Sequence, residues 1–207
     1  MKKILLIAFF ISAATVASAQ FFQGWGLMAG GTLGRQKWLY YNPDSHYRSK
    51  YLLRYNAELF AEFGSHPTFR WVTEVQYNVK GAKVTEAGST VKYQNQYAAW
   101  NNYLMVRKEL YAVIPYFKIG PRAEYVFSSD QSFNKFHITG AAGAGVEFVA
   151  YGPVKFITEA WWVPDASKSF SSDALAIKQH CWELRVGIKI GKKGDANCAA
   201  YKDQPND

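Results

Sequence analysis

The chain has 207 residues, a formal net charge of +8, 17% aromatic residues and 19% charged residues. This length suits one domain, and its basic residues are spread along the chain, which argues against a nucleic-acid-binding protein. The four histidines are scattered, and no G-x-S-x-G elbow, P-loop or HExxH motif is present, so we expect no metal site and no cofactor.

The N-terminal segment is organised like a secretory signal peptide. Lys2 and Lys3 precede an apolar run over residues 4–16, and Ala17-Ser18-Ala19 forms an A-x-A cleavage site before Gln20. The alternative is a membrane anchor, but about 13 apolar residues are fewer than the roughly 20 that a spanning helix needs. We therefore expect residues 1–19 to be removed during export.

The mature chain alternates apolar and polar residues with a period of two, which is typical of strands. The clearest case is 51–63, where Arg54, Glu58 and Glu62 lie on the face opposite the apolar residues. In 97–106, Trp100 and Asn101 make the two faces hard to assign. In chain order the predicted strands are 25–33, 51–63, 69–80, 97–106, 111–127, 136–148, 154–163 and 181–190.

The predicted connections alternate between long and short: 35–50, 64–68, 81–96, 107–110, 128–135, 150–153 and 164–177. Outer-membrane barrels combine long external loops with short periplasmic turns, and an even number of strands returns both termini to the periplasm. No second apolar run reaches helical spanning length, so a barrel is the remaining way to cross a membrane. The sequence predicts an all-β fold, an eight-stranded antiparallel up-and-down transmembrane β-barrel over 20–190, followed by a polar periplasmic tail over 191–207.

The alternation alone does not decide which face meets lipid, because a soluble periplasmic ligand-binding barrel alternates too, with its apolar face inward. Two features favour an apolar outer face. Charges of both signs nearly cancel on the polar face, which suits a narrow, plugged lumen, and many aromatic residues lie near strand ends, as in membrane girdles. The predicted lumen charge network consists of Arg54, Glu58, Glu62, Glu74, Lys118, Arg122, Glu124, Glu147, Lys155, Glu159, Glu183 and Arg185.

Three stretches carry a family resemblance: EVQYNVKG at 74–81, IPYFKIGPR at 114–122 and GAAGAGVEF at 140–148. They resemble porin-family proteins with an outer-membrane β-barrel domain of the OmpA/OmpX size class. The resemblance implies an eight-stranded barrel in the outer membrane without a cofactor, and it implies little about biochemical role. The chain departs from this group at its C-terminus, where Ile190 is followed by a polar tail rather than ending on an aromatic residue.

One short motif raises the possibility of catalysis. Some eight-stranded outer-membrane barrels modify lipid A, and one deacylase type uses a His-x-Ser pair with an acidic partner. Here the nearest match is His137-x-Thr139, with Glu147 further along the same strand. The strand parity points all three side chains into the lumen, away from lipid, so we expect no enzyme and keep a lipid-modifying enzyme as the alternative.

The external loops are the remaining candidates for interaction. Exposed aromatic and basic residues suit glycans, lipopolysaccharide phosphates or a partner protein, although the strands could instead continue past the membrane. The possible loop contacts are Lys37, Trp38, Tyr40, Tyr41 and Arg48, with Lys50, Lys83 and Lys92 nearby. We expect a monomeric structural or surface-interaction barrel in contact with outer-membrane lipid and lipopolysaccharide.

The two cysteines are not expected to form a disulfide bond. Cys181 opens the last predicted strand on the external side, whereas Cys198 lies in the periplasmic tail. A disulfide bond needs Cα atoms within roughly 7 Å, and a strand of nearly bilayer length separates these two residues.

Overall fold

The computed structural model describes residues 21–40, 48–86, 89–110, 113–130, 134–149, 153–164, 170–171 and 175–191. The predicted signal peptide, Tyr41, Cys198 and nearly all of the predicted tail lie outside these residues. The strands are β1 (Phe22–Tyr40), β2 (Arg48–Phe63), β3 (Phe69–Glu86), β4 (Ser89–Arg107), β5 (Val113–Ser129), β6 (Phe136–Val149), β7 (Val154–Val163), β8 (Phe170–Ser171) and β9 (Leu175–Gly191).

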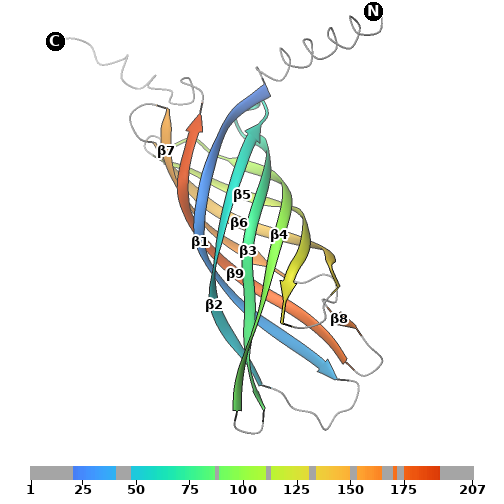
Figure 1. Ribbon diagram of the computed structural model, residues 1–207. Coiled ribbons are helices and arrows are strands. Elements are labelled where there is room, and N and C mark those ends of the chain that lie inside the picture. Colours follow the sequence, from blue (N-terminus) through green and yellow to red (C-terminus); the bar gives the residue numbers. More distant parts are fainter. Residues whose placement is uncertain are drawn as a thin grey trace, which may run out of the picture.

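The long strands close into a barrel (Figure 1). From β1 to β7 each strand pairs with the next, β7 pairs with β9, and β9 pairs back with β1. All these pairings are antiparallel, and the two-residue β8 adds only to the edge of β9. The predicted eight-stranded antiparallel up-and-down barrel is therefore confirmed.

The two ends of the barrel differ in their connections. Gly24 of β1 pairs with Gly191 of β9, so the described barrel starts and finishes at the same end, which we call the periplasmic end. At this end Gly64 begins the short β2–β3 turn with a φ of 122°, a conformation that glycine adopts without strain. The opposite end, which carries the β3–β4 hairpin, is called the external end.

Strands at the external end are longer than the sequence predicted. The predicted loop 81–96 is wrong, because Gly81 to Glu86 pair residue by residue with Gln94 to Ser89. The β-branched pairs Val84–Val91 and Thr85–Thr90 lie within this segment, and such cross-strand pairs stabilise a strand even where the surrounding residues are polar. The polar composition that suggested a loop thus belongs to a hairpin that extends beyond the membrane.

Strands β1 and β3 touch at the external end, although β2 lies between them in the sheet order. A Cβ atom added to Gly34 would lie 2.7 Å from the carbonyl oxygen of Gly81 and 3.2 Å from its nitrogen. The register of β2 against β3 shifts between Tyr51 and Asn56, and such an irregularity bends a strand. Beyond this contact, β1 and the β3–β4 hairpin diverge in Figure 1.

Replacement of Gly34 by valine should destabilise this contact, because the new side chain would meet backbone rather than a flexible side chain. We expect Gly34→Val to lower the free energy of unfolding by about 1–3 kcal/mol. Gly140→Val is the matched control, since no atom lies within 4 Å of its added Cβ. Urea unfolding in detergent micelles, followed by tryptophan fluorescence, measures both. Equal costs at the two positions would contradict the close approach of β1 and β3.

The outer surface of the barrel is apolar and the inner surface is polar. Large apolar side chains that face outward include Leu27, Leu53, Leu59, Trp71, Val75, Trp100, Leu104, Ile119, Ile138, Phe156, Trp182, Leu184 and Val186. A soluble barrel turns its apolar set inward, so this arrangement contradicts the soluble alternative. The ambiguity in 97–106 is also resolved, because Trp100 is exposed and Asn101 is buried.

Aromatic side chains gather at both ends of this apolar belt. On the external side the ring of Tyr77 lies 6.0 Å from that of Tyr55 and 5.8 Å from that of Phe127. On the periplasmic side the ring of Phe63 lies 6.0 Å from that of Phe21 and 6.3 Å from that of Trp71. Amphipathic rings favour the headgroup level of a membrane, so the two clusters mark the belt's boundaries. Within the part of the chain described here, no helix has the length and apolar character of a membrane span.

Candidate functional site

The centre of the lumen is organised around Arg185 of β9. Its Nη1 atom lies 2.6 Å from Oε2 of Glu58 and 3.3 Å from Oε2 of Glu74, two carboxylates supplied by β2 and β3. Its Nε donates a hydrogen bond of 3.2 Å to Glu183, two residues earlier on the same face of β9. All four side chains are buried, so one guanidinium joins carboxylates from three strands.

Two further cations complete the central network. Lys118 of β5 lies 3.0 Å from Glu74 and 2.7 Å from Glu159, and Nη1 of Arg122 lies 3.1 Å from Glu183. Arg122 also pairs with Glu124, which in turn pairs with Lys80. These contacts compensate buried charges that would otherwise be costly in a narrow lumen.

Three central carboxylates could be read as a metal site. One oxygen atom each of Glu58, Glu74 and Glu159 lies within 4.8 Å of the others. However, Arg185 and Lys118 already lie among these oxygens and supply two positive charges. The geometry therefore fits an internal ion-pair cluster better than a site for a divalent cation.

A second group of ion pairs lies at the periplasmic end. Glu62 faces Arg107 at 3.2 Å and Arg70 at 3.8 Å, and it also pairs with Lys189. Lys189 continues to Glu147 at 2.9 Å, and Lys155 lies 3.6 Å from the same carboxylate.

Sequence reasoning missed Arg107, because it was assigned to the turn 107–110. Its side chain is buried, and β4 runs one residue further than predicted. The signal was available, since Arg107 continues the inward parity of Asn101, Tyr103 and Met105.

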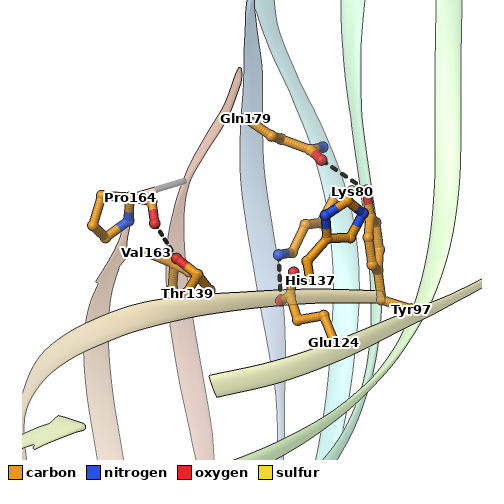
Figure 2. Close-up of a pocket in the computed structure, with 8 residues that line it drawn as sticks. All are labelled: Lys80, Tyr97, Glu124, His137, Thr139, Val163, Pro164 and Gln179. Atoms are coloured by element: carbon orange, nitrogen blue, oxygen red, sulfur yellow. Dashed lines mark hydrogen bonds and ion pairs between the residues drawn. The ribbon is translucent and has the colours of Figure 1, made fainter. Parts of the chain in front are cut away.

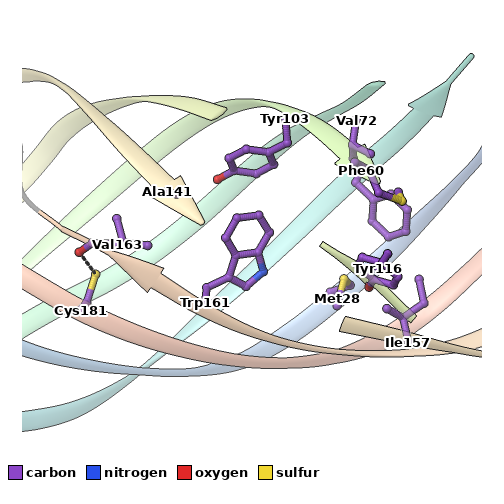
Figure 3. Close-up of a cluster of buried hydrophobic side chains, with 11 residues drawn as sticks. Met28, Phe60, Val72, Tyr103, Tyr116, Ala141, Ile157, Trp161, Val163 and Cys181 are labelled. Atoms are coloured by element: carbon purple, nitrogen blue, oxygen red, sulfur yellow. Dashed lines mark hydrogen bonds between the residues drawn. The ribbon is translucent and has the colours of Figure 1, made fainter. Parts of the chain in front are cut away.

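The lumen also holds a cluster of apolar side chains, which the sequence analysis did not predict (Figure 3). Trp161 is 1% exposed, and its ring centroid lies 4.5 Å from that of Tyr103. Cations lie over its ring, with Cζ of Arg185 at 4.8 Å and Nζ of Lys118 at 5.7 Å, distances typical of cation–π contacts. The ion pairs and this ring together fill the middle of the barrel.

Arg54 is the exception among the predicted network residues. It is half-buried, and its Nη1 donates a hydrogen bond of 3.2 Å to the carbonyl oxygen of Leu53. It makes no ion pair with any residue that the structure describes. Arg54 lies in the segment of β2 where the register against β3 shifts, but it keeps the parity of the buried Leu52 and Asn56 and pairs with the buried Thr32 of β1.

A small polar cavity lies at the external end of the lumen (Figure 2). Its volume is about 10 Å³, the space of roughly one water molecule. Thr139 donates a hydrogen bond to the carbonyl oxygen of Pro164, and His137 lies opposite Glu124 in the β5–β6 register. The lining residues are Lys80, Tyr97, Glu124, His137, Thr139, Val163, Pro164 and Gln179.

This cavity does not assemble the arrangement that a lipid-modifying enzyme would need. Glu147 lies eight residues beyond Thr139 on β6, roughly 26 Å along an extended strand, and pairs with Lys189 and Lys155 at the other end. The side chains of His137 and Thr139 are buried, and the cavity beside them has room for a water molecule rather than an acyl chain.

The predicted loop contacts lie largely in strands. Lys37, Trp38 and Tyr40 belong to β1 and pair with Lys178, Ile177 and Leu175 of β9. Arg48 begins β2 opposite Thr85. These residues therefore belong to the extended strands of the external end, whereas the sequence placed them in a loop.

The described cysteine is not part of a disulfide bond. Cys181 is free and buried, and its Sγ lies 3.9 Å from the carbonyl oxygen of Val163 on the neighbouring strand β7. It faces the lumen, on the same side of β9 as Glu183 and Arg185.

No protein-family model and no curated protein matches this chain, but several solved structures do. The outer membrane protein OprG from Pseudomonas aeruginosa is 11% identical over 83% of this chain and 97% of that chain, with a TM-score of 0.58. Neisserial surface protein A (NspA) is 12% identical over 81% and 96%, with a TM-score of 0.53. The outer membrane protein AlkL is 11% identical over 84% and 92%, with a TM-score of 0.51.

These likenesses confirm the fold as that of small outer-membrane β-barrels in the OmpA/OmpX size class. The term porin family describes this group only loosely. Together with the apolar outer belt, this fold makes the chain an outer-membrane barrel.

Proposed function

We propose that this barrel is a plugged, membrane-integrated protein with a structural and surface-interaction role, and that it acts neither as an enzyme nor as an open pore. The observation that carries the proposal is the filled lumen, in which Arg185 joins Glu58, Glu74 and Glu183 beside the buried ring of Trp161. Because the lumen is filled, we assign any binding of molecules from outside the membrane to the external end of the barrel.

The size of the barrel supports this assignment. Eight strands enclose an interior that side chains can fill, whereas diffusion channels of the general porin type need about 16 strands. The space beside lumen glycines is filled by neighbouring side chains and does not form an open path. At Gly145, for example, an added Cβ atom would lie 2.5 Å from the Tyr116 ring. We propose that the barrel works as a monomer, surrounded by the lipid and lipopolysaccharide of its own membrane.

Electrical recording in planar lipid bilayers tests the plugged lumen. We expect the wild-type barrel to give no steady conductance above the protein-free bilayer, because the ion pairs and Trp161 block the central path. Trp161→Ala removes the largest fully buried side chain among the described residues and is expected to admit small ions. Insertion of the wild-type barrel is checked in the same bilayers by heat-modifiable gel mobility of the recovered protein. A steady wild-type conductance would contradict the proposal.

A further inference from the structure

Three lysines stand side by side on the extended strands of the external end. Lys50 of β2 pairs directly with Lys83 of β3, and Lys83 pairs directly with Lys92 of β4. Directly paired residues of antiparallel strands point to the same face, with Cβ atoms about 4.5–5.5 Å apart. Lys50, Lys83 and Lys92 therefore form one basic row across three strands, which we call the lysine row.

Among the side chains that the structure describes, none supplies a countercharge to the lysine row. Lys50 and Lys92 are exposed and Lys83 is half-buried, and none of the three forms an ion pair with a residue that the structure describes. Like charges directly opposite one another destabilise a sheet. A row of three in perfect register is therefore unfavourable alone and becomes favourable when an anion lies across it.

Hydroxyl groups extend the row on the same face. Thr85 and Thr90 are two residues beyond Lys83 and Lys92 on their strands, and they pair with each other. Their Oγ1 atoms lie 3.2 Å apart. Flexible ammonium groups beside hydroxyl donors match the several oxygens of a phosphate group, which accepts charge-assisted hydrogen bonds from both.

The height of the lysine row indicates where its ligand lies. Lys83 is six residues beyond Tyr77 of the external aromatic cluster, which is about 20 Å along the strand and about 14 Å along the membrane normal at a tilt near 45°. This level is outside the hydrocarbon and beyond the headgroup plane marked by the aromatic rings. In an outer membrane, the sugar core of lipopolysaccharide occupies this layer.

Building on the proposed function, we propose that Lys50, Lys83 and Lys92, assisted by Thr85 and Thr90, bind phosphate groups on the core sugars of neighbouring lipopolysaccharide. The row then ties the β2–β3–β4 extension to the surface layer of the membrane.

The test measures binding of purified lipopolysaccharide with a phosphorylated core to the full barrel in detergent micelles at about 0.1 M salt, where exposed charges at close range still interact. The variant Lys50→Gln/Lys83→Gln/Lys92→Gln should bind at least about tenfold more weakly than wild type, because three charge-assisted contacts are lost. Enzymatic removal of the core phosphates should weaken binding to wild type by the same factor. Dephosphorylated lipopolysaccharide should thus bind wild type as weakly as phosphorylated lipopolysaccharide binds the triple variant.

The matched control is Lys108→Gln/Lys135→Gln, which removes two exposed lysines outside the row and should leave binding unchanged. The triple variant should also unfold at the same urea concentration as wild type or at a higher one, because the repulsion among the three lysines has been removed. Loss of stability in that variant would mean a structural role and would overturn the proposal. Tighter binding of a free sulfated glycan than of phosphorylated lipopolysaccharide would overturn it as well.

The outcomes separate this site from the proposed function. If wild type binds phosphorylated lipopolysaccharide and the triple variant binds it equally well, the lysine row is wrong but interaction at the surface stands. If an epitope inserted between Glu86 and Ser89 cannot be labelled on intact cells, the hairpin is not external and both proposals fail.

Discussion

Replacement of Arg185 by alanine is expected to lower the free energy of unfolding by about 3–5 kcal/mol, the cost of leaving buried charges without their partner. The guanidinium contacts Glu58, Glu74 and Glu183, and it also lies over the ring of Trp161. Alanine would leave a cluster of carboxylates in which Lys118 and Arg122 are the remaining central cations.

Arg54→Ala is the matched control for this prediction. Arg54 has the same side chain on the same barrel, but it is half-buried and its described contact is a hydrogen bond to the carbonyl oxygen of Leu53. We expect Arg54→Ala to cost less than about 1 kcal/mol, as for an exposed charge. Urea unfolding of both variants in lipid vesicles gives the comparison, and similar costs would mean that water rather than ion pairs stabilises the lumen charges.

Replacement of Leu59 by arginine tests the outer face. Leu59 lies midway along β2 between Tyr55 and Phe63, whose rings belong to the external and periplasmic aromatic clusters. An arginine at the bilayer midplane on the lipid face of a barrel costs about 2–4 kcal/mol. We therefore expect Leu59→Arg to lower the free energy of unfolding in lipid vesicles by this amount.

Leu110→Arg provides a control of equal exposure. Leu110 lies in the connection between β4 and β5 and is 48% exposed, whereas Leu59 is 49% exposed. In water the two substitutions would be equivalent, and in a membrane only Leu59 meets hydrocarbon. We expect Leu110→Arg to cost less than about 0.5 kcal/mol. If Leu59→Arg is as mild as Leu110→Arg, the outer belt does not face lipid.

In the proposed function, the lumen and the external end of this barrel have different roles. Ion pairs such as Arg185–Glu58 and Lys189–Glu147 connect strands that are not adjacent in the sheet. Backbone pairing keeps β2, β3 and β4 in register at the external end. That register is what brings Lys50, Lys83 and Lys92 into one row.

Local sequence pattern could predict the strands and their faces. The alternation around Glu58 and Leu59, for example, correctly separates an inward carboxylate from an outward aliphatic side chain, because successive residues of any strand point to opposite sides. The same rule identified the inward residues Glu74, Arg122 and Glu183. The parity also holds at Arg54, since Leu52 and Asn56 on either side of it are buried, but it did not reveal that the described contact of Arg54 is the carbonyl oxygen of Leu53.

The number of strands, their antiparallel order and the apolar outer face were thus determined by the sequence itself, since each depends on a period of two and on short turns. Only the tertiary structure decided which charges meet, because closing the barrel joins residues as distant as Glu62 and Lys189. It also decided that residues 81–86 and 89–94 pair with each other and that three lysines are aligned. Register between strands sets these contacts, and register depends on the pairing of whole strands rather than on any one segment.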